Sequence, residues 1–269
     1  MRGKTALLCL LCTCFFLLPN GQVFASSATA YKDYLYQFDT YRTKQNNFKV
    51  ARTEYLKYKT LLSETTALDT VKAMLTQQDQ LLRSYLLFLN EKLNENTGLS
   101  ASDKNLYQTL IQNEVKFLET HAALIPSIGA LADATNVSKQ LESHYLVLQI
   151  SIRQTIIALG QGDLAKLNNE FTVTYNALQT LAKSNAAGFS PEKQATIDRW
   201  LLQINNKQSL FEQKMTQITT ANSQIKGTTE ADMNTMFVGV QKNLGEAKQY
   251  LTEGKSYMQE LINLLRYQN

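Results

Sequence analysis

The spacing of apolar residues predicts a chain made almost entirely of long helices. Apolar positions recur at alternating steps of three and four residues, which is the pattern of a helix that buries one seam. Two such series, over residues 197–225 and 233–265, continue for nine and ten positions. Each predicts a helix of roughly 35 residues, and the short link at 226–229 predicts an antiparallel hairpin. In that hairpin we expect Gly254 to lie opposite the Trp200-Leu201 pair, with a small residue facing large ones.

Weaker series of the same kind predict five helices in the earlier part of the chain. They cover residues 30–62, 66–94, 102–125, 137–159 and 163–181. Thr66 and Asp69 resemble a capping box, and Ser190 before Pro191 is typical of a helix start. Gly160-Gln161-Gly162 is expected to separate the fourth helix from the fifth. The sequence therefore predicts an all-α fold, an elongated bundle of about seven long antiparallel helices with coiled-coil-like heptad packing.

The first 25 residues have the layout of a secretory signal peptide. Arg2 and Lys4 precede an apolar run at 5–18, and Ala25 offers a small residue for cleavage, with cleavage after residue 30 as the alternative. A run of 14 residues rises only about 21 Å as a helix, less than the ~30 Å of a membrane core. We therefore expect an exported protein that is secreted, periplasmic or extracellular. We expect no transmembrane segment in the mature chain, and peripheral association with the cell envelope stays open.

The mature region, residues 26–269, is expected to be helical throughout. It can be read as one region, or as a three-helix unit at 26–130 followed by a four-helix unit at 131–269. The link at 130–135 is the best candidate for a boundary, because it follows Pro126 and Gly129, two residues that end helices.

Charge and cysteine content exclude several classes of function. The chain has 27 Lys and Arg against 23 Asp and Glu; without Arg2 and Lys4 the mature region has 25 against 23, a net charge of +2. So small a charge argues against nucleic-acid binding, which needs many unbalanced cations. Cys9, Cys12 and Cys14 all lie in the signal. The mature region therefore has no disulfide, thiol nucleophile or cysteine metal site.

The histidines do not form a recognisable catalytic or metal motif. Glu119 precedes His121 by two residues, and Glu142 precedes His144 by two. Side chains two apart on a helix point about 200° away from each other, so neither pair can hold one ion. We expect both histidines to be solvated or at the edge of a seam, although they could meet across two neighbouring helices. With no nucleophile motif and no phosphate loop either, we expect no catalytic, cofactor or metal residue and no enzyme activity.

The first helix has an unusual surface. Residues 31–58 include six tyrosines, and residues 32–59 have seven bases against three acids. They could form a basic aromatic surface for an anionic polymer, but the bases do not project as one stripe, and we favour a core seam through Tyr34, Phe38 and Phe48. Tyr36 and Tyr58 project away from that seam and are candidates for partner contact.

Polar residues at seam positions are candidates for setting helix register or oligomeric state. They are Gln45, Arg52, Gln78, Gln208 and Asn222. We expect leucine at the last two to stabilise the fold.

These observations favour a non-enzymatic interaction or structural protein of the cell envelope or extracellular space. Such a protein would present long helix faces to a protein partner or to itself. The alternative is an extracytoplasmic ligand-binding or sensing domain with a small-molecule pocket between helices, near Tyr41, Phe48 and Tyr55.

Overall fold

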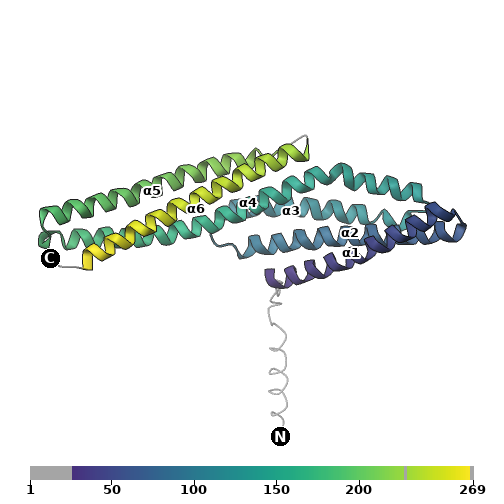
Figure 1. The fold of residues 1–269 in the computed structure, drawn as a ribbon, viewed down its shortest axis with the longest axis horizontal. Helices are drawn as coiled ribbons and strands as arrows, with labels where there is room; N and C mark the ends of the chain where they lie inside the picture. Colours follow the sequence, from purple (N-terminus) through teal and green to yellow (C-terminus); the bar gives the residue numbers. More distant parts are fainter. Residues whose placement is uncertain (1–25, 227–228, 267–269) are drawn as a thin grey trace, which may run out of the picture.

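The computed structural model describes residues 26–226 and 229–266, and these residues form six α-helices packed together (Figure 1). The helices are α1 (Ser27–Tyr58), α2 (Leu61–Glu95), α3 (Ala101–Ala122), α4 (Leu131–Ser184), α5 (Pro191–Ser223) and α6 (Glu230–Arg266), with two single-turn 3₁₀ helices, η1 (Ile125–Ser127) and η2 (Ala186–Gly188). The described residues contain no strand. The all-α prediction is confirmed.

The expected break at Gly160-Gln161-Gly162 is wrong, because these residues lie inside the continuous helix α4. The helices expected at 137–159 and 163–181 are therefore one helix. Gly162 serves a different purpose: the turn between α2 and α3 packs directly on it. Asn96 Nδ2 donates to the Leu159 carbonyl at 3.2 Å and to Asp163 Oδ1 at 3.0 Å. A Cβ atom on Gly98 would overlap the Gly162 carbonyl oxygen, so the glycines permit close approach of two backbones.

Helix α4 runs along the whole molecule and contributes to two bundles (Figure 1). Its first part packs against α2 and α3, around a core that includes Leu86, Ile111 and Leu148. Its second part packs against α5 and α6, around a core that includes Ile204 and Phe211. The division into units 26–130 and 131–269 stays a prediction; in the structure, α4 contacts helices on both sides of that division.

Helices α5 and α6 lie side by side and antiparallel (Figure 1). Two ion pairs connect them, Lys207–Glu253 at 2.5 Å and Lys214–Glu246 at 2.8 Å. Gly227 and Thr228 of the connecting turn lie outside the described residues. The expected contact of Gly254 is wrong: a Cβ there would meet the ring of Phe171 on α4 and the Cβ of Lys207 on α5 rather than Trp200 or Leu201. The reason is that α6 packs against two helices, and the large residue that faces Gly254 comes from α4.

One helix start follows the expected capping chemistry and one differs from it. Ser190 caps α5 and Pro191 is its first residue, as expected, and Ser100 caps α3 in the same way. Helix α2 begins earlier than expected, because Thr60 and Ser63 form its capping box in place of Thr66 and Asp69.

Helix α1 lies antiparallel to α2 and buries little of itself. Its buried residues are Ser27 and Ala51. Ser27 donates from its N–H and hydroxyl groups to the Glu95 carboxylate at 2.8 and 2.6 Å, which lowers the pKa of Glu95. At the other end, Lys59 turns the chain into α2 in the left-handed conformation, with φ of 49°.

Candidate functional site

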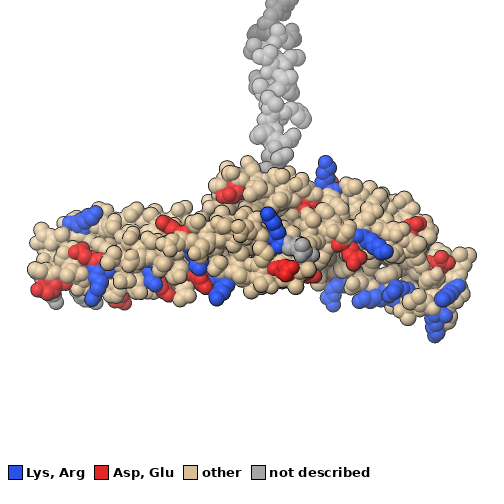
Figure 2. Space-filling model, turned by 90° about the horizontal axis from the view of Figure 1, so that it is seen from above, with Lys and Arg blue, Asp and Glu red and all other residues tan. Residues whose placement is uncertain are grey.

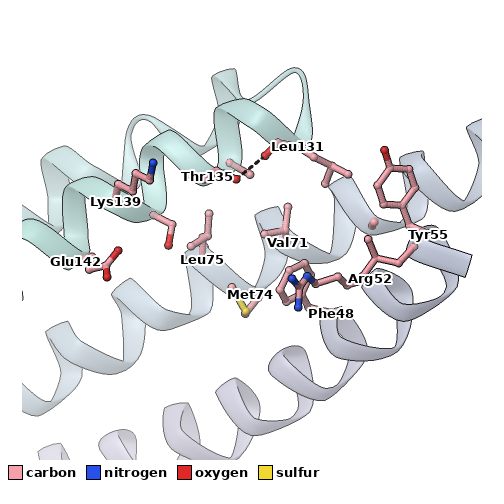
Figure 3. Close-up of a pocket in the computed structure, with 14 residues that line it drawn as sticks. Phe48, Arg52, Tyr55, Val71, Met74, Leu75, Leu131, Thr135, Lys139 and Glu142 are labelled. Atoms are coloured by element: carbon pink, nitrogen blue, oxygen red, sulfur yellow. Dashed lines mark hydrogen bonds between the residues drawn. The ribbon is translucent and has the colours of Figure 1, made fainter. Parts of the chain in front are cut away.

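A groove of about 330 Å³ lies between α1, α2 and α4 (Figure 3). Its apolar floor comes from α2 and includes Val71, Met74 and Leu75, and its walls include Phe48 and Tyr55 of α1. Ala67 and Ala134, both buried, also line it. Because their side chains are short, they leave space that larger residues would fill.

The rim of the groove is charged. Arg52 comes from α1, and Lys139 and Glu142 come from α4 (Figure 3). All three residues are exposed, and none of their side chains forms an ion pair or hydrogen bond with another described residue. An apolar floor with unpaired charges at the rim suits a molecule that has an apolar body and a charged end.

A second candidate site is a buried pair of titratable residues between α2 and α3. His121 Nδ1 lies 2.8 Å from Asp79 Oδ2, and His121 Nε2 lies 3.0 Å from the Val137 carbonyl oxygen of α4. A carbonyl oxygen only accepts, so Nε2 carries a proton and donates it. The hydrogen bond that Asp79 accepts from His121 raises the pKa of His121, and burial raises the pKa of Asp79. The pair therefore holds the proton between Nδ1 and Oδ2 firmly.

A second pair of a histidine and a carboxylate lies beside the first. His144 Nε2 of α4 lies 2.7 Å from Glu114 Oε2 of α3, and the Ser151 hydroxyl donates to Glu114 Oε1 at 3.0 Å. The ring of Phe117 stacks on both imidazoles, with centroids 3.6 Å from His144 and 6.1 Å from His121. These residues form a polar layer across α2, α3 and α4, which we call the histidine layer.

The structure corrects the expectation for His121. It is buried rather than solvated or at a seam edge, since Asp79 and Val137 satisfy both ring nitrogens inside the core. His144 is partly buried, and both histidine rings stack on Phe117. Glu119, two residues before His121, instead pairs with Arg83 at 3.1 Å. Within the described residues, no group of three or more His, Cys, Asp or Glu side chains is arranged to hold a metal ion.

Sequence reasoning missed Asp79 and Glu114, although the chain contains a signal for both. Each stands in a three-four apolar series, Asp79 between Leu75 and Leu82, and Glu114 between Ile111 and Leu118. A charged residue at a buried seam position needs a partner, so these positions could have been matched with the histidines.

The candidates for partner contact on α1 are exposed. Tyr36 is 68% and Tyr58 is 59% exposed. The expected core seam of α1 is shallow: Tyr34 contacts Tyr85 of α2, with ring centroids 5.1 Å apart, while Phe38 remains exposed.

The five register candidates have different surroundings. Gln45 donates to the Tyr41 hydroxyl at 3.4 Å, Arg52 lies on the groove rim, and Gln78 is half-buried. Gln208 donates to Thr172 Oγ1 of α4 at 2.8 Å. Asn222 donates to the Tyr107 hydroxyl at 2.9 Å and the Gln154 carbonyl at 3.1 Å, so it links α5 to α3 and α4. A role in setting register stays a prediction for all five.

These contacts separate the expected effects of leucine at Gln208 and Asn222. Leucine at Asn222 should lower the free energy of unfolding by about 1–3 kcal/mol, because it leaves the part-buried Gln154 carbonyl and the Tyr107 hydroxyl without this donor. Leucine at the half-buried Gln208 should be neutral or stabilising. Urea unfolding followed by circular dichroism measures both. Equal stabilisation by the two substitutions would contradict a linking role for Asn222.

Comparisons with protein-family models, with curated proteins and with solved structures give no match. Among the described helices, none is long and apolar enough to cross a membrane.

Proposed function

We propose that this chain is an exported, non-enzymatic interaction protein that presents helix faces to a protein partner or to a second copy of itself. The observation that carries the proposal is the apolar surface that α1 leaves exposed. Large apolar side chains remain exposed along the helix, among them Tyr31, Leu35, Tyr36 and Phe38. Aromatic side chains supply much of the contact energy at protein interfaces, and a run of them on one helix is more than scattered surface apolarity.

Coiled-coil-like heptad packing is part of this proposal. In α5 the buried apolar residues recur every seven positions, at Ile197, Ile204, Phe211 and Ile218, and in α6 Met233, Val240 and Ala247 do the same. This spacing supports long, regular helices whose outer faces stay straight enough to contact a partner over several turns.

Native mass spectrometry of the protein recovered from its host's exported fraction tests the proposal. We expect a multimer or a retained protein partner. Leu35→Ser/Tyr36→Ser should reduce that association at least tenfold without changing helix content, because both side chains are already exposed. Val173→Ser/Leu202→Ser, at exposed apolar positions on α4 and α5, is the matched control. A wild-type monomer with no bound protein would contradict the proposal.

The groove favours a second candidate function, the binding of a small molecule. It lies beside Phe48 and Tyr55, two of the three residues near which a pocket was expected, although Tyr41 does not line it. The candidate ligand has an apolar body and a charged end that meets Arg52, Lys139 or Glu142.

A bulky residue in the groove should prevent such binding. Thr135 lines the groove and its hydroxyl donates only to the Leu131 carbonyl, so Thr135→Trp should fill the space with little effect on folding. We expect a small mass retained by the wild type in native mass spectrometry to be lost from this variant and kept by Thr109→Trp, at an exposed site on α3. Retention of the mass by both variants would place the ligand elsewhere.

A further inference from the structure

The turn between α1 and α2 carries exposed leucines at the end of the molecule. We call residues 49–64 the α1–α2 tip. Leu61 is 81% and Leu62 is 78% exposed, more than any other large apolar side chain among the described residues. Leu56 and Tyr58 are also exposed. Adjacent leucines at the start of a helix, with no side chain packed over them, form a protruding apolar point rather than a groove.

The same tip is rich in unpaired positive charge. Lys49, Arg52, Lys57 and Lys59 lie on it, and none of them forms an ion pair with another described residue. Two cations of the α5–α6 hairpin, Lys207 and Lys214, are instead paired with acids.

The positive charge is concentrated at this end of the molecule. Residues 42–64 contain six bases and two acids, a net charge of +4, whereas residues 26–269 as a whole carry +2. Figure 2 shows Lys and Arg side chains gathered at the right-hand end of the molecule, where the turn between α1 and α2 lies in Figure 1.

Lys59 occupies a position that favours glycine. Its φ of 49° is left-handed, a conformation that is unfavourable for a residue with a side chain. The lysine adds a cation to the turn beside Tyr58 and Leu61. Lys57 also remains near the apolar surface, with its ammonium 4.9 Å from the centroid of the Tyr58 ring.

We propose that the α1–α2 tip docks on the surface of a bilayer rich in anionic phospholipid. Leu61 and Leu62 enter the boundary between headgroups and acyl chains, while the lysines and Arg52 bind phosphates. Long basic side chains reach the headgroups as their stems lie along apolar surface. A protruding pair of leucines among cations suits a deformable apolar layer beneath a layer of anions better than an acidic protein, which would need a matching hollow. This lipid surface is a partner beyond the protein partner proposed for the exposed apolar side chains of α1.

The proposal is tested by flotation with lipid vesicles, using the protein recovered from its host's exported fraction. One vesicle set contains phosphatidylcholine and phosphatidylglycerol in equal parts, and the other contains phosphatidylcholine alone. We expect binding to the first set only, weakened by salt. Lys57→Gln/Lys59→Gly should weaken it about 30-fold, since each cation near an anionic surface contributes about a fivefold effect. Glycine suits the left-handed position, so this variant keeps the fold.

Leu61→Gln/Leu62→Gln should weaken binding at least tenfold. The matched controls change exposed residues outside the tip. Lys116→Gln/Lys166→Gln removes two lysines, and Val173→Gln/Val238→Gln removes two apolar side chains. Both controls should bind as the wild type does. Absence of flotation, equal flotation with neutral vesicles, or equal losses in the controls would overturn the proposal. So would an acidic protein that is retained by the wild type and lost from the tip variants, if neither vesicle set binds.

Discussion

Alanine in place of Asp79 should lower the free energy of unfolding by about 3–5 kcal/mol, the effect of breaking a buried charged pair. The substitution leaves His121 Nδ1 without its acceptor at 2.8 Å, in a core where the histidine side chain is 1% exposed. Urea unfolding, followed by the circular dichroism of the helices, measures the change. Gln80→Ala, at the adjacent exposed position on α2, should change the free energy of unfolding by less than about 0.5 kcal/mol.

The double variant Asp79→Leu/His121→Leu shows whether the loss of stability comes from leaving His121 unpaired or from changing the residue at position 79. Removing both partners leaves no unpaired titratable group, so this variant should recover most of the stability that Asp79→Ala loses. Its leucines continue the apolar seams of α2 and α3. If the double variant were as unstable as the sum of the two single variants, the two side chains would not be coupled.

The same pair should make stability depend on pH. The folded pKa of His121 is raised above its ordinary 6.5, so its contribution is complete below that value and is lost as the pH rises through the raised pKa. The pKa of Asp79 is raised from 3.8, and its effect has the same sign. Wild-type stability should therefore fall as the pH rises above 6.5, and it should fall less in Asp79→Leu/His121→Leu. A wild-type profile no steeper than that of the double variant would contradict the assignment.

Local periodicity made much of the fold predictable. The helices α5 and α6 follow from apolar positions that repeat every three or four residues, and Ser190 with Pro191 marks a helix start by its own chemistry. Each of these signals lies within one turn of helix, where backbone geometry decides which side chains share a face.

The histidine layer was not predictable in the same way, because α2 has two apolar faces. On one face, Gln77 donates to Gln37 and Tyr85 packs on Tyr34, both of α1. On the other, Leu75 packs against α4 and Asp79 pairs with His121 of α3. A single sequence shows both faces without saying which helix covers each. The groove depends likewise on how far α1 stands from α4, and that distance is a property of packing rather than of any local pattern.

The course of α4 depends on a contact that no local rule contains. A glycine inside a helical pattern costs about 1 kcal/mol, so two of them two residues apart favour a break. The break does not occur, since Gly162 receives the turn at Gly98 and Asn96 bonds to the α4 backbone beside it. The cost in helix propensity is offset by a tertiary contact from another part of the chain.

Alanine in place of Gly98 should therefore destabilise the protein by about 3 kcal/mol. The new Cβ would overlap the Gly162 carbonyl oxygen and press on the Lys166 amide at 3.0 Å, and backbone atoms of a helix cannot move aside as a flexible side chain can. Gly162→Ala should also destabilise the fold, because its Cβ would meet the Asn96 side chain that holds the turn in place. Calorimetry and urea unfolding measure both effects.

Gly239→Ala and Gly245→Ala are the matched controls for these substitutions. Both glycines lie inside α6 with nothing within 4 Å of an added Cβ, so alanine should stabilise the protein by up to about 1 kcal/mol at each position. In the double variant Gly98→Ala/Gly162→Ala, the loss of stability should be smaller than the sum of the two single losses, because one displacement of the turn relieves both overlaps. If Gly98→Ala instead behaved like Gly239→Ala, the turn would not press on α4. The continuity of α4 through Gly162 would then need a cause other than this contact.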